Sequence, residues 1–188
     1  MKLIGSTTSP YVRKVRLLLG DTDYEFETLK ALTPEGSKLL ETYGPVKRIP
    51  ILLIDGKQIF DSTIICDYLL EKQGTVLTVD DKLNLRLIDE LCDSCIILFQ
   101  QKAWQIDPDW QNEMSTRMLS RAFGILDTIE QLLKDEQLSD FQRDWLYCVI
   151  DWLSFRSVIN WEKGHPEMQK FYNKAKLSPR YQSTSLKL

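Results

Sequence analysis

The sequence predicts an α/β unit followed by an all-α unit. Strand and helix patterns alternate over residues 1–74, whereas every pattern from Val79 onward is helical. The chain of 188 residues is long enough for two such units packed together. We expect the first unit at residues 1–76 and the second, helical unit at residues 80–188.

The first unit opens with a short apolar strand, Lys2–Gly5, which is followed by a helix, Pro10–Leu19. A proline suits the first position of that helix, and Gly20 suits the position just past its end. Alternating polar and apolar residues predict a strand at Tyr24–Leu29, and a weaker helical pattern covers Pro34–Tyr43.

A hairpin followed by a helix is the clearest local signal. Ile51–Ile54 is an apolar run, Asp55-Gly56 is a tight-turn dipeptide, and Gln58–Phe60 is a second short strand. Asp61-Ser62 can cap the next helix, Thr63–Lys72. The order βαβαββα predicts a small sheet with a parallel half and a hairpin edge.

Apolar residues recur at spacings of three and four throughout the second unit, which predicts helices. The expected helices cover Asp81–Ala103, Trp110–Lys134, residues 138–159 and Pro166–Ala175. Ser139 and Gln142 match a capping box at the start of the third helix, which is apolar enough to form the centre of this unit. We expect the residues from Ser178 onward to form a surface tail.

The charge balance excludes several kinds of partner. A formal net charge of −3 provides no basic field for nucleic acid or for an anionic membrane. The cluster Arg13, Lys14 and Arg16 is predicted to be a solvated helix face. Without a cleavable signal or a run of membrane-spanning length, we expect a cytoplasmic protein. The four cysteines lack the spacing of a disulfide framework.

Ser9 lies between the first predicted strand and the first predicted helix. Its hydroxyl can simply cap the helix. The same position faces the N–H groups of the first turn, where the helix dipole carries about +0.5 charge, so a thiolate would be stabilised there. A plain cap and a reactive site both fit these residues.

Two further junctions could bind an extended ligand. If the Ile49–Pro50 peptide bond is cis, the preceding backbone turns outward, and Ile49 could pair with such a ligand. Asp61 and Ser62 could hold a carboxylate through the Ser62 hydroxyl and the N–H groups of the helix start, or they could form a plain cap.

Cys92 and Cys95 have CxxC spacing, which can indicate redox chemistry or half of a zinc site. Both fall on the apolar stripe of a helix and no partner motif follows, so we interpret them as core residues. His165, the single histidine, is interpreted as a helix-entry residue rather than as the base of a Ser–His dyad. We expect no metal site. Trp104 and Trp110 border a break between helices and could line a pocket.

Three stretches of the chain resemble the cytosolic glutathione transferase family, especially its short bacterial members. They are MKLIGSTTSPYVRKVRLLL, GPVKRIPILLIDGKQIFDSTIICDYL and DWLSFR…INWEKGHPEMQKFY. The middle stretch is the most specific, because it combines the pre-strand proline, the hairpin and the acidic-serine helix cap at the family's spacing. The resemblance covers nearly the whole chain and implies a thioredoxin-like first domain and a helical second domain.

The resemblance also implies a role for each junction. Ser9 matches the reactive position, whose hydroxyl hydrogen-bonds the glutathione thiolate, and Ile49 matches the residue whose backbone pairs with the cysteinyl part of glutathione. Pro50 matches the family's cis proline, and Asp61 and Ser62 match the pair that binds the γ-glutamyl end. Glutathione is then the co-substrate, no metal takes part, and the second substrate is a small hydrophobic electrophile or a peroxide.

The second domain is expected to build the electrophile pocket, for which Tyr11 and Trp104 are candidate residues. The sequence departs from the family in this domain, because Phe141 stands where the family has a serine or threonine that caps the central helix. Ser139 can cap that helix instead. The resemblance also implies a homodimer, formed through the helix after the Asp-Ser cap and the helix that carries the CxxC pair.

The leading hypothesis is a transferase that binds glutathione and activates its thiol. One alternative is a glutathione-dependent thiol-disulfide oxidoreductase, because Ser-Pro-Tyr-Val lies where glutaredoxin-like relatives have Cys-Pro-Tyr-Cys and because Cys92 and Cys95 form a CxxC. Ser9 argues against it, since a hydroxyl cannot form a mixed disulfide. The other alternative is a non-catalytic interaction module on the same fold.

Overall fold

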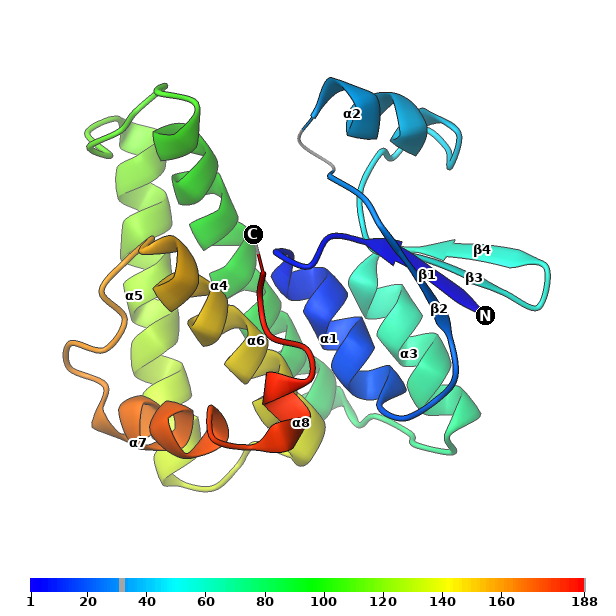
Figure 1. The fold of residues 1–188 in the computed structure, drawn as a ribbon. Helices are drawn as coiled ribbons and strands as arrows, with labels where there is room; N and C mark the ends of the chain where they lie inside the picture. Colours follow the sequence, from blue (N-terminus) through cyan, green and yellow to red (C-terminus); the bar gives the residue numbers. More distant parts are fainter. Residues whose placement is uncertain (31–32, 188) are drawn as a thin grey trace. The chain divides into compact units, whose positions relative to one another are not determined.

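The computed structural model describes residues 1–30 and 33–187 (Figure 1). The chain divides into two compact units. One comprises Met1–Val76 together with the C-terminal segment from Pro179, and the other comprises Leu77–Ser178. The C-terminal segment was expected to belong to the helical unit, and its grouping with the first unit is a difference from that expectation.

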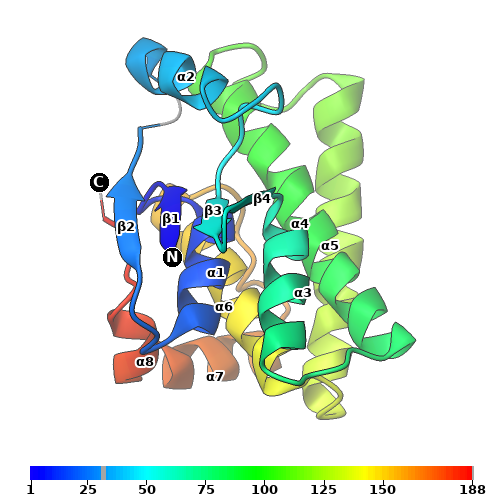
Figure 2. The same cartoon turned by 90° about the vertical axis from the view of Figure 1, so that its right-hand side faces the viewer.

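A four-stranded sheet forms the centre of the first unit. Its strands are β1 (Lys2–Gly5), β2 (Glu25–Thr28), β3 (Ile51–Ile54) and β4 (Lys57–Phe60). They lie in the order β2-β1-β3-β4 (Figure 2), with β1 parallel to β2 and with β3 antiparallel to both β1 and β4. The predicted parallel half and hairpin edge are therefore confirmed.

Three helices complete the βαβαββα order. α1 (Pro10–Leu19) and α3 (Ser62–Lys72) pack against each other, whereas α2 (Pro34–Glu41) lies apart from this pair (Figures 1 and 2). Leu40 of α2 joins Ile4 of β1 in a buried apolar cluster. The sheet is thus covered by apolar side chains from helices that are near it in sequence, as its alternating pattern predicts.

The second unit consists of helices. They are α4 (Val79–Ala103), α5 (Glu113–Lys134), α6 (Asp140–Arg156) and α7 (Pro166–Ala175). α6 contributes Trp145 and Trp152, two of the three largest fully buried side chains, and the indole Nε1 of Trp145 donates a hydrogen bond of 2.6 Å to Asp89 of α4. Its central position is therefore confirmed. Within the described part of the chain, no helix is both long and apolar enough to cross a membrane.

The start of α6 is capped as predicted, but the start of α5 is later than expected. Ser139 and Gln142 form the capping box, each side chain bonding the other residue's backbone N–H. α5 begins at Glu113 rather than at Trp110, because the carboxylate of Asp107 accepts the backbone N–H groups of Gln111 and Asn112. These bonds hold the chain in a turn before the helix begins.

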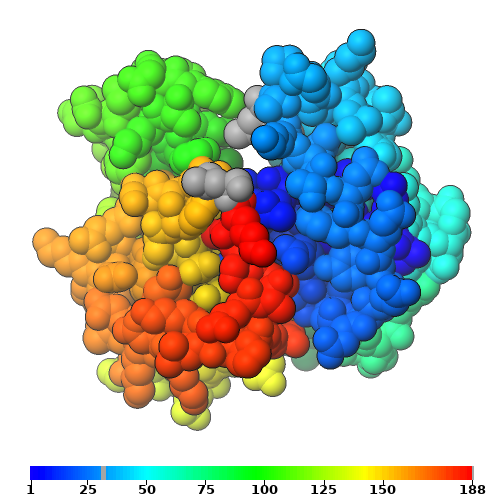
Figure 3. Space-filling model, viewed as in Figure 1, coloured from blue at the N-terminus to red at the C-terminus, as the bar shows by residue number. Residues whose placement is uncertain are grey.

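The predicted solvated face of α1 is wrong. Arg13 and Lys14 are buried, with 2% and 3% of their surface exposed. The C-terminal segment covers Arg13, whose guanidinium donates to Tyr181 O at 2.9 Å and to Thr184 Oγ1 at 3.3 Å. This segment contains α8 (Pro179–Gln182) and is drawn in red beside the blue N-terminal residues in Figure 3. The expected surface tail is therefore partly buried structure.

Candidate functional site

Three chain junctions converge at one end of the sheet. Ile4 of β1 pairs with Ile51 of β3, and Ile51 pairs with Phe60 of β4. Ser9 follows the end of β1, Pro50 precedes the start of β3, and Asp61 follows the end of β4. Neighbouring strands lie about 4.8 Å apart, so the three strand ends span about 10 Å. An extended chain of three residues has about this length.

Ser9 is the N-cap of α1, as predicted. Its Oγ accepts a hydrogen bond of 3.3 Å from the backbone N–H of Val12, and Pro10 occupies the first helical position. A hydroxyl that accepts one bond still has its own proton to donate. The first turn of α1 contains no acidic side chain, so none there offsets the positive end of the helix dipole. The geometry is compatible with a cap and with an anion-binding hydroxyl together.

Gly5 allows the start of α1 to lie close to the end of β1. A Cβ atom at this residue would lie 2.5 Å from Cγ2 and 2.7 Å from Cγ1 of Val12. Such distances are far below ordinary contact, so a larger residue would push the first turn of α1 away from β1. The position of Ser9 therefore depends on this glycine, which sequence analysis did not single out.

The Ile49–Pro50 peptide bond is cis. Ile49 packs against the apolar cluster of the sheet, and Pro50 is buried. Regular strand pairing of β3 begins at Ile51, so Ile49 lies just outside the ladder. The cis bond on which pairing of Ile49 with an extended ligand depends is therefore present.

Asp61 and Ser62 form the start of α3. The carboxylate of Asp61 accepts the N–H groups of Thr63 at 2.8 Å and of Ile64 at 3.3 Å. Asp61 has φ 70° and ψ 125°, a conformation that costs a non-glycine residue of order 1–3 kcal/mol and that is often found at functional sites. Ser62 is 6% exposed, so its hydroxyl lies in a largely water-excluded position at the positive end of α3.

The two residues predicted for the electrophile pocket belong to different units. Tyr11 is half-buried in the first turn of α1, in the first unit. Trp104 follows the end of α4 in the second unit, where it is 57% exposed. Trp110 donates its indole N–H to Leu98 O at 3.0 Å. A role for Tyr11 and Trp104 stays a prediction.

The CxxC pair and the histidine are structural, as interpreted. Cys92 and Cys95 are fully buried and form no disulfide, and burial raises the pKa of the Cys95 thiol to about 12. His165 is buried, with its ring nitrogens 2.8 Å from Trp161 O and 3.1 Å from Asp127 Oδ1. Within residues 1–30 and 33–187, no cluster of His, Cys, Asp and Glu could hold a metal ion.

The C-terminal segment also reaches the loop that carries Ser9. Thr7, two residues before Ser9, donates its hydroxyl proton to Lys187 O at 2.9 Å. Arg180 donates to Leu17 O at 3.3 Å. These contacts lie 163 to 180 residues apart in sequence, and no local pattern indicates them. Sequence reasoning therefore missed them.

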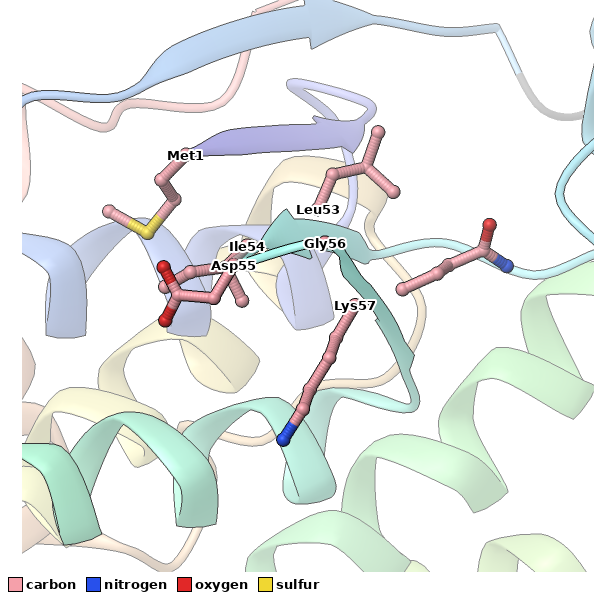
Figure 4. Close-up of a pocket in the computed structure, with 7 residues that line it drawn as sticks. Met1, Leu53, Ile54, Asp55, Gly56 and Lys57 are labelled. Carbon is pink, nitrogen blue, oxygen red and sulfur yellow. The ribbon is translucent and has the colours of Figure 1, made fainter.

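A hollow beside the β3–β4 turn lies at the opposite end of the sheet. It is lined by Met1 and by residues from Leu53 to Gln58, most of which are labelled in Figure 4. Ile54 pairs with Lys57 at the turn, whereas the three junctions lie beyond the other end of this ladder. The hollow contains none of the predicted site residues.

Comparison with known proteins finds a family match within the first unit. Residues 3–76 match the family model of the glutathione S-transferase N-terminal domain. This stretch contains Ser9, Ile49, Pro50, Asp61 and Ser62.

Curated relatives and solved structures extend this similarity to the second unit. The uncharacterized GST-like protein YibF of Escherichia coli (strain K12) is 28% identical over 184 residues, which cover 90% of this chain and 91% of that protein. Glutathione S-transferase U6 of Arabidopsis thaliana is 30% identical over 102 residues, which cover 52% of this chain and 46% of that protein.

Two solved structures share the fold. A glutathione transferase family member from Pseudomonas fluorescens Pf-5 with bound glutathione has a TM-score of 0.82 at 22% identity, covering 100% of this chain and 99% of that one. A glutathione S-transferase from Methylobacterium radiotolerans in complex with glutathione sulfonate has a TM-score of 0.83 at 23% identity, covering 100% of this chain and 95% of that one. The chain therefore has the glutathione transferase fold, and the predicted fold class is confirmed.

Proposed function

We propose that this chain binds glutathione at the three converging junctions and activates its thiol. The observation that carries the proposal is the register Ile4–Ile51–Phe60, which brings Ser9, Ile49–Pro50 and Asp61–Ser62 to one end of the sheet. The ends of the three strands span about 10 Å, which suits an extended tripeptide. The glutathione bound in the Pseudomonas fluorescens relative supports the choice of ligand.

Each junction would bind one part of the tripeptide. The γ-glutamyl carboxylate would be held by the Ser62 hydroxyl and the start of α3, and the γ-glutamyl ammonium by the carboxylate of Asp61. The backbone of Ile49 would pair with the cysteinyl residue, as an added strand does. The glutathione sulfur would then lie at Ser9, where the start of α1 favours a negative charge.

Ser9 would stabilise the thiolate by donating its hydroxyl proton while it accepts the N–H of Val12. Stabilising the thiolate lowers the pKa of the glutathione thiol, so more of it is ionised near neutral pH. The sulfur then attacks an electrophile or a peroxide, and the protein contributes orientation and electrostatic stabilisation. No metal is needed for this step.

The structure disfavours a thiol-disulfide oxidoreductase. Its candidate cysteines, Cys92 and Cys95, are fully buried, and burial raises the pKa of the Cys95 thiol to about 12. A thiol with so high a pKa is a poor nucleophile at neutral pH. Ser9 cannot form a mixed disulfide, so neither motif supplies the reactive sulfur of that mechanism.

Calorimetric titration with glutathione tests the proposal. We expect binding to the wild-type chain and about tenfold weaker binding to Ser62→Ala, because a hydrogen bond to a charged group is lost. Ser94→Ala is the matched control, since Ser94 is a buried helical serine in the second unit. Absence of binding to the wild-type chain at millimolar glutathione would contradict the proposal. Binding without any conjugation would favour the non-catalytic module.

We further propose that the chain works in the cytoplasm as a homodimer. None of the four cysteines forms a disulfide, as is usual in a reducing compartment. Ile64 of α3 and Leu83 of α4, the helices that the resemblance places at the interface, are 56% and 62% exposed. Sedimentation of the wild-type chain and of Ile64→Asp tests the dimer, which predicts a larger species that the aspartate disrupts.

A further inference from the structure

The C-terminal segment, residues 179–187, runs along α1 in the opposite direction (Figure 1). Near its start, Arg180 donates a hydrogen bond of 3.3 Å to Leu17 O in the last turn of α1. At its end, Lys187 O accepts the hydroxyl proton of Thr7 at 2.9 Å, in the turn before α1. The segment and α1 belong to the same compact unit, so these contacts lie within one body.

The middle of the segment is anchored to α1 by a buried cation. The guanidinium of Arg13, which is 2% exposed, donates to Tyr181 O at 2.9 Å and to Thr184 Oγ1 at 3.3 Å. Tyr181 and Thr184 are themselves buried. A buried charge is costly unless its hydrogen bonds are made, so the segment has to stay docked while Arg13 is buried. Lys187 therefore follows directly on an anchored part of the chain.

Thr7 lies in the turn that places Ser9 at the start of α1. The backbone N–H of Ser9 donates to Ser6 O at 3.2 Å, and the hydroxyl oxygens of Ser6 and Thr8 lie 2.9 Å apart. These bonds are local to the turn, whereas the bond from Thr7 reaches a residue 180 positions later. Thr7 is half-buried, and only Thr8 separates it from Ser9. A displacement of Thr7 is therefore transmitted to Ser9 through a short, hydrogen-bonded piece of backbone.

We propose that the C-terminal segment is a strap that holds the turn carrying Ser9 through Thr7, so that docking of the segment and binding of the glutathione thiolate are coupled. This rests on the proposed function, in which Ser9 donates to the thiolate. Thr7 is a positioning residue, because its hydroxyl bonds Lys187 O and acts on the sulfur only through Ser9. Hydrogen bonds weaken steeply with misalignment, so a displaced Ser9 would stabilise the thiolate less. The coupling is reciprocal: bound glutathione must also hold the segment more tightly.

Glutathione and S-methylglutathione, which has no ionisable thiol, test this inference as a pair of ligands. For Thr7→Val we expect the pKa of the bound glutathione thiol to rise by about half a unit, which corresponds to about threefold weaker binding of the thiolate. S-methylglutathione should bind to Thr7→Val with unchanged affinity, because it forms no thiolate. Thr7→Ser should restore the wild-type thiol pKa, because it keeps the hydroxyl.

Thr128→Val is the matched control. The hydroxyl of Thr128 also donates to a backbone carbonyl at 2.9 Å, that of Gly124 in α5, but this bond lies in the second unit. It should leave the thiol pKa unchanged. The inference is overturned if Thr7→Val leaves the thiol pKa as in the wild-type chain, or if Thr128→Val raises it equally.

A truncated chain that ends at Ser185 removes the acceptor instead of the donor. It lacks Lys187 but keeps the two residues that accept from Arg13, so the anchored part of the segment stays. We expect the truncation to raise the thiol pKa as much as Thr7→Val does. Combining the two changes should add nothing further, because both break the same bond. Two effects that add in full would overturn the inference.

Amide hydrogen exchange separates this inference from the proposed function. Without glutathione, exchange at Ser9, whose N–H donates to Ser6 O, should be faster in Thr7→Val than in the wild-type chain. Saturating glutathione should slow exchange at Ser183 and Ser185, whose N–H groups donate within the segment, about threefold in the wild-type chain alone. A wild-type chain that binds glutathione without this slowing refutes the coupling alone. A wild-type chain that does not bind glutathione refutes the proposed function, and exchange at Ser9 without ligand still decides whether the segment holds the turn.

Discussion

Replacing Arg13 with methionine is expected to destabilise the first unit. Methionine keeps most of the apolar stem, so the main loss is the guanidinium with its bonds to Tyr181 O and Thr184 Oγ1. A hydrogen bond to a charged group contributes about 1.5–3 kcal/mol. The 3.3 Å bond to Thr184 is the weaker of the two. We therefore expect the free energy of unfolding to fall by about 3 kcal/mol in Arg13→Met.

Urea unfolding followed by circular dichroism measures this change, and amide hydrogen exchange reports whether the C-terminal segment detaches. Arg117→Met is the control, because Arg117 of α5 has 73% of its side chain exposed and lies 3.9 Å from Glu113, so its loss should cost less than about 0.5 kcal/mol. Arg13→Met should also speed exchange at residues 179–187. Equal stability of the two variants, with unchanged hydrogen exchange at residues 179–187, would refute the stabilising role that we assign to the C-terminal segment.

Three further predictions concern single residues. Gly5→Ala should cost about 1–3 kcal/mol of stability and weaken glutathione binding, because its Cβ would lie 2.5 Å from Val12 Cγ2; calorimetry with no change in affinity would contradict this. Cys95 should resist thiol reagents at neutral pH until the chain unfolds, because burial raises its pKa to about 12, and rapid labelling of the folded chain would show otherwise. Hydrogen bonds from Thr78 lower the pKa of Asp81 in the folded state, so their stabilisation is fully present above the ordinary value of 3.8 and is lost as the pH falls below it through the lower folded-state pKa. Asp81→Asn should therefore lose less stability than the wild-type chain on acidification. Urea unfolding at neutral and at acid pH measures this loss, and an equal loss in both chains would contradict the prediction.

Local signals explain why so much of the fold was predictable. The helix α1 is bounded by Pro10 and Gly20, and the Asp55-Gly56 turn sets the β3–β4 hairpin, so each element depends on residues within a few positions. The residues of the candidate site were predictable for the same reason, because Ser9, Pro50 and Asp61 each lie just before a helix or strand. Their convergence follows once the strand order is known.

Long-range contacts explain what the sequence could not predict. The charges of Arg13 and Lys14 were visible, but the segment that covers Arg13 lies 168 to 171 residues away. Charge patterning assigns such residues to solvent unless a covering element is known. The delayed start of α5 has another cause, because the carboxylate of Asp107 holds a turn that competes with helix formation.

The pKa of the bound glutathione thiol reports directly on whether Ser9 stabilises the thiolate. It is measured by titrating the ultraviolet absorbance of the thiolate with pH, in the wild-type chain and in Ser9→Ala. Ser139→Ala serves as the control, because it removes a helix cap in the second unit at a cost of about 1 kcal/mol without touching the proposed site. We expect the bound thiol to have a pKa below that of free glutathione, and we expect this pKa to rise by about one unit in Ser9→Ala alone. An identical thiol pKa in the wild-type chain and in Ser9→Ala would contradict it.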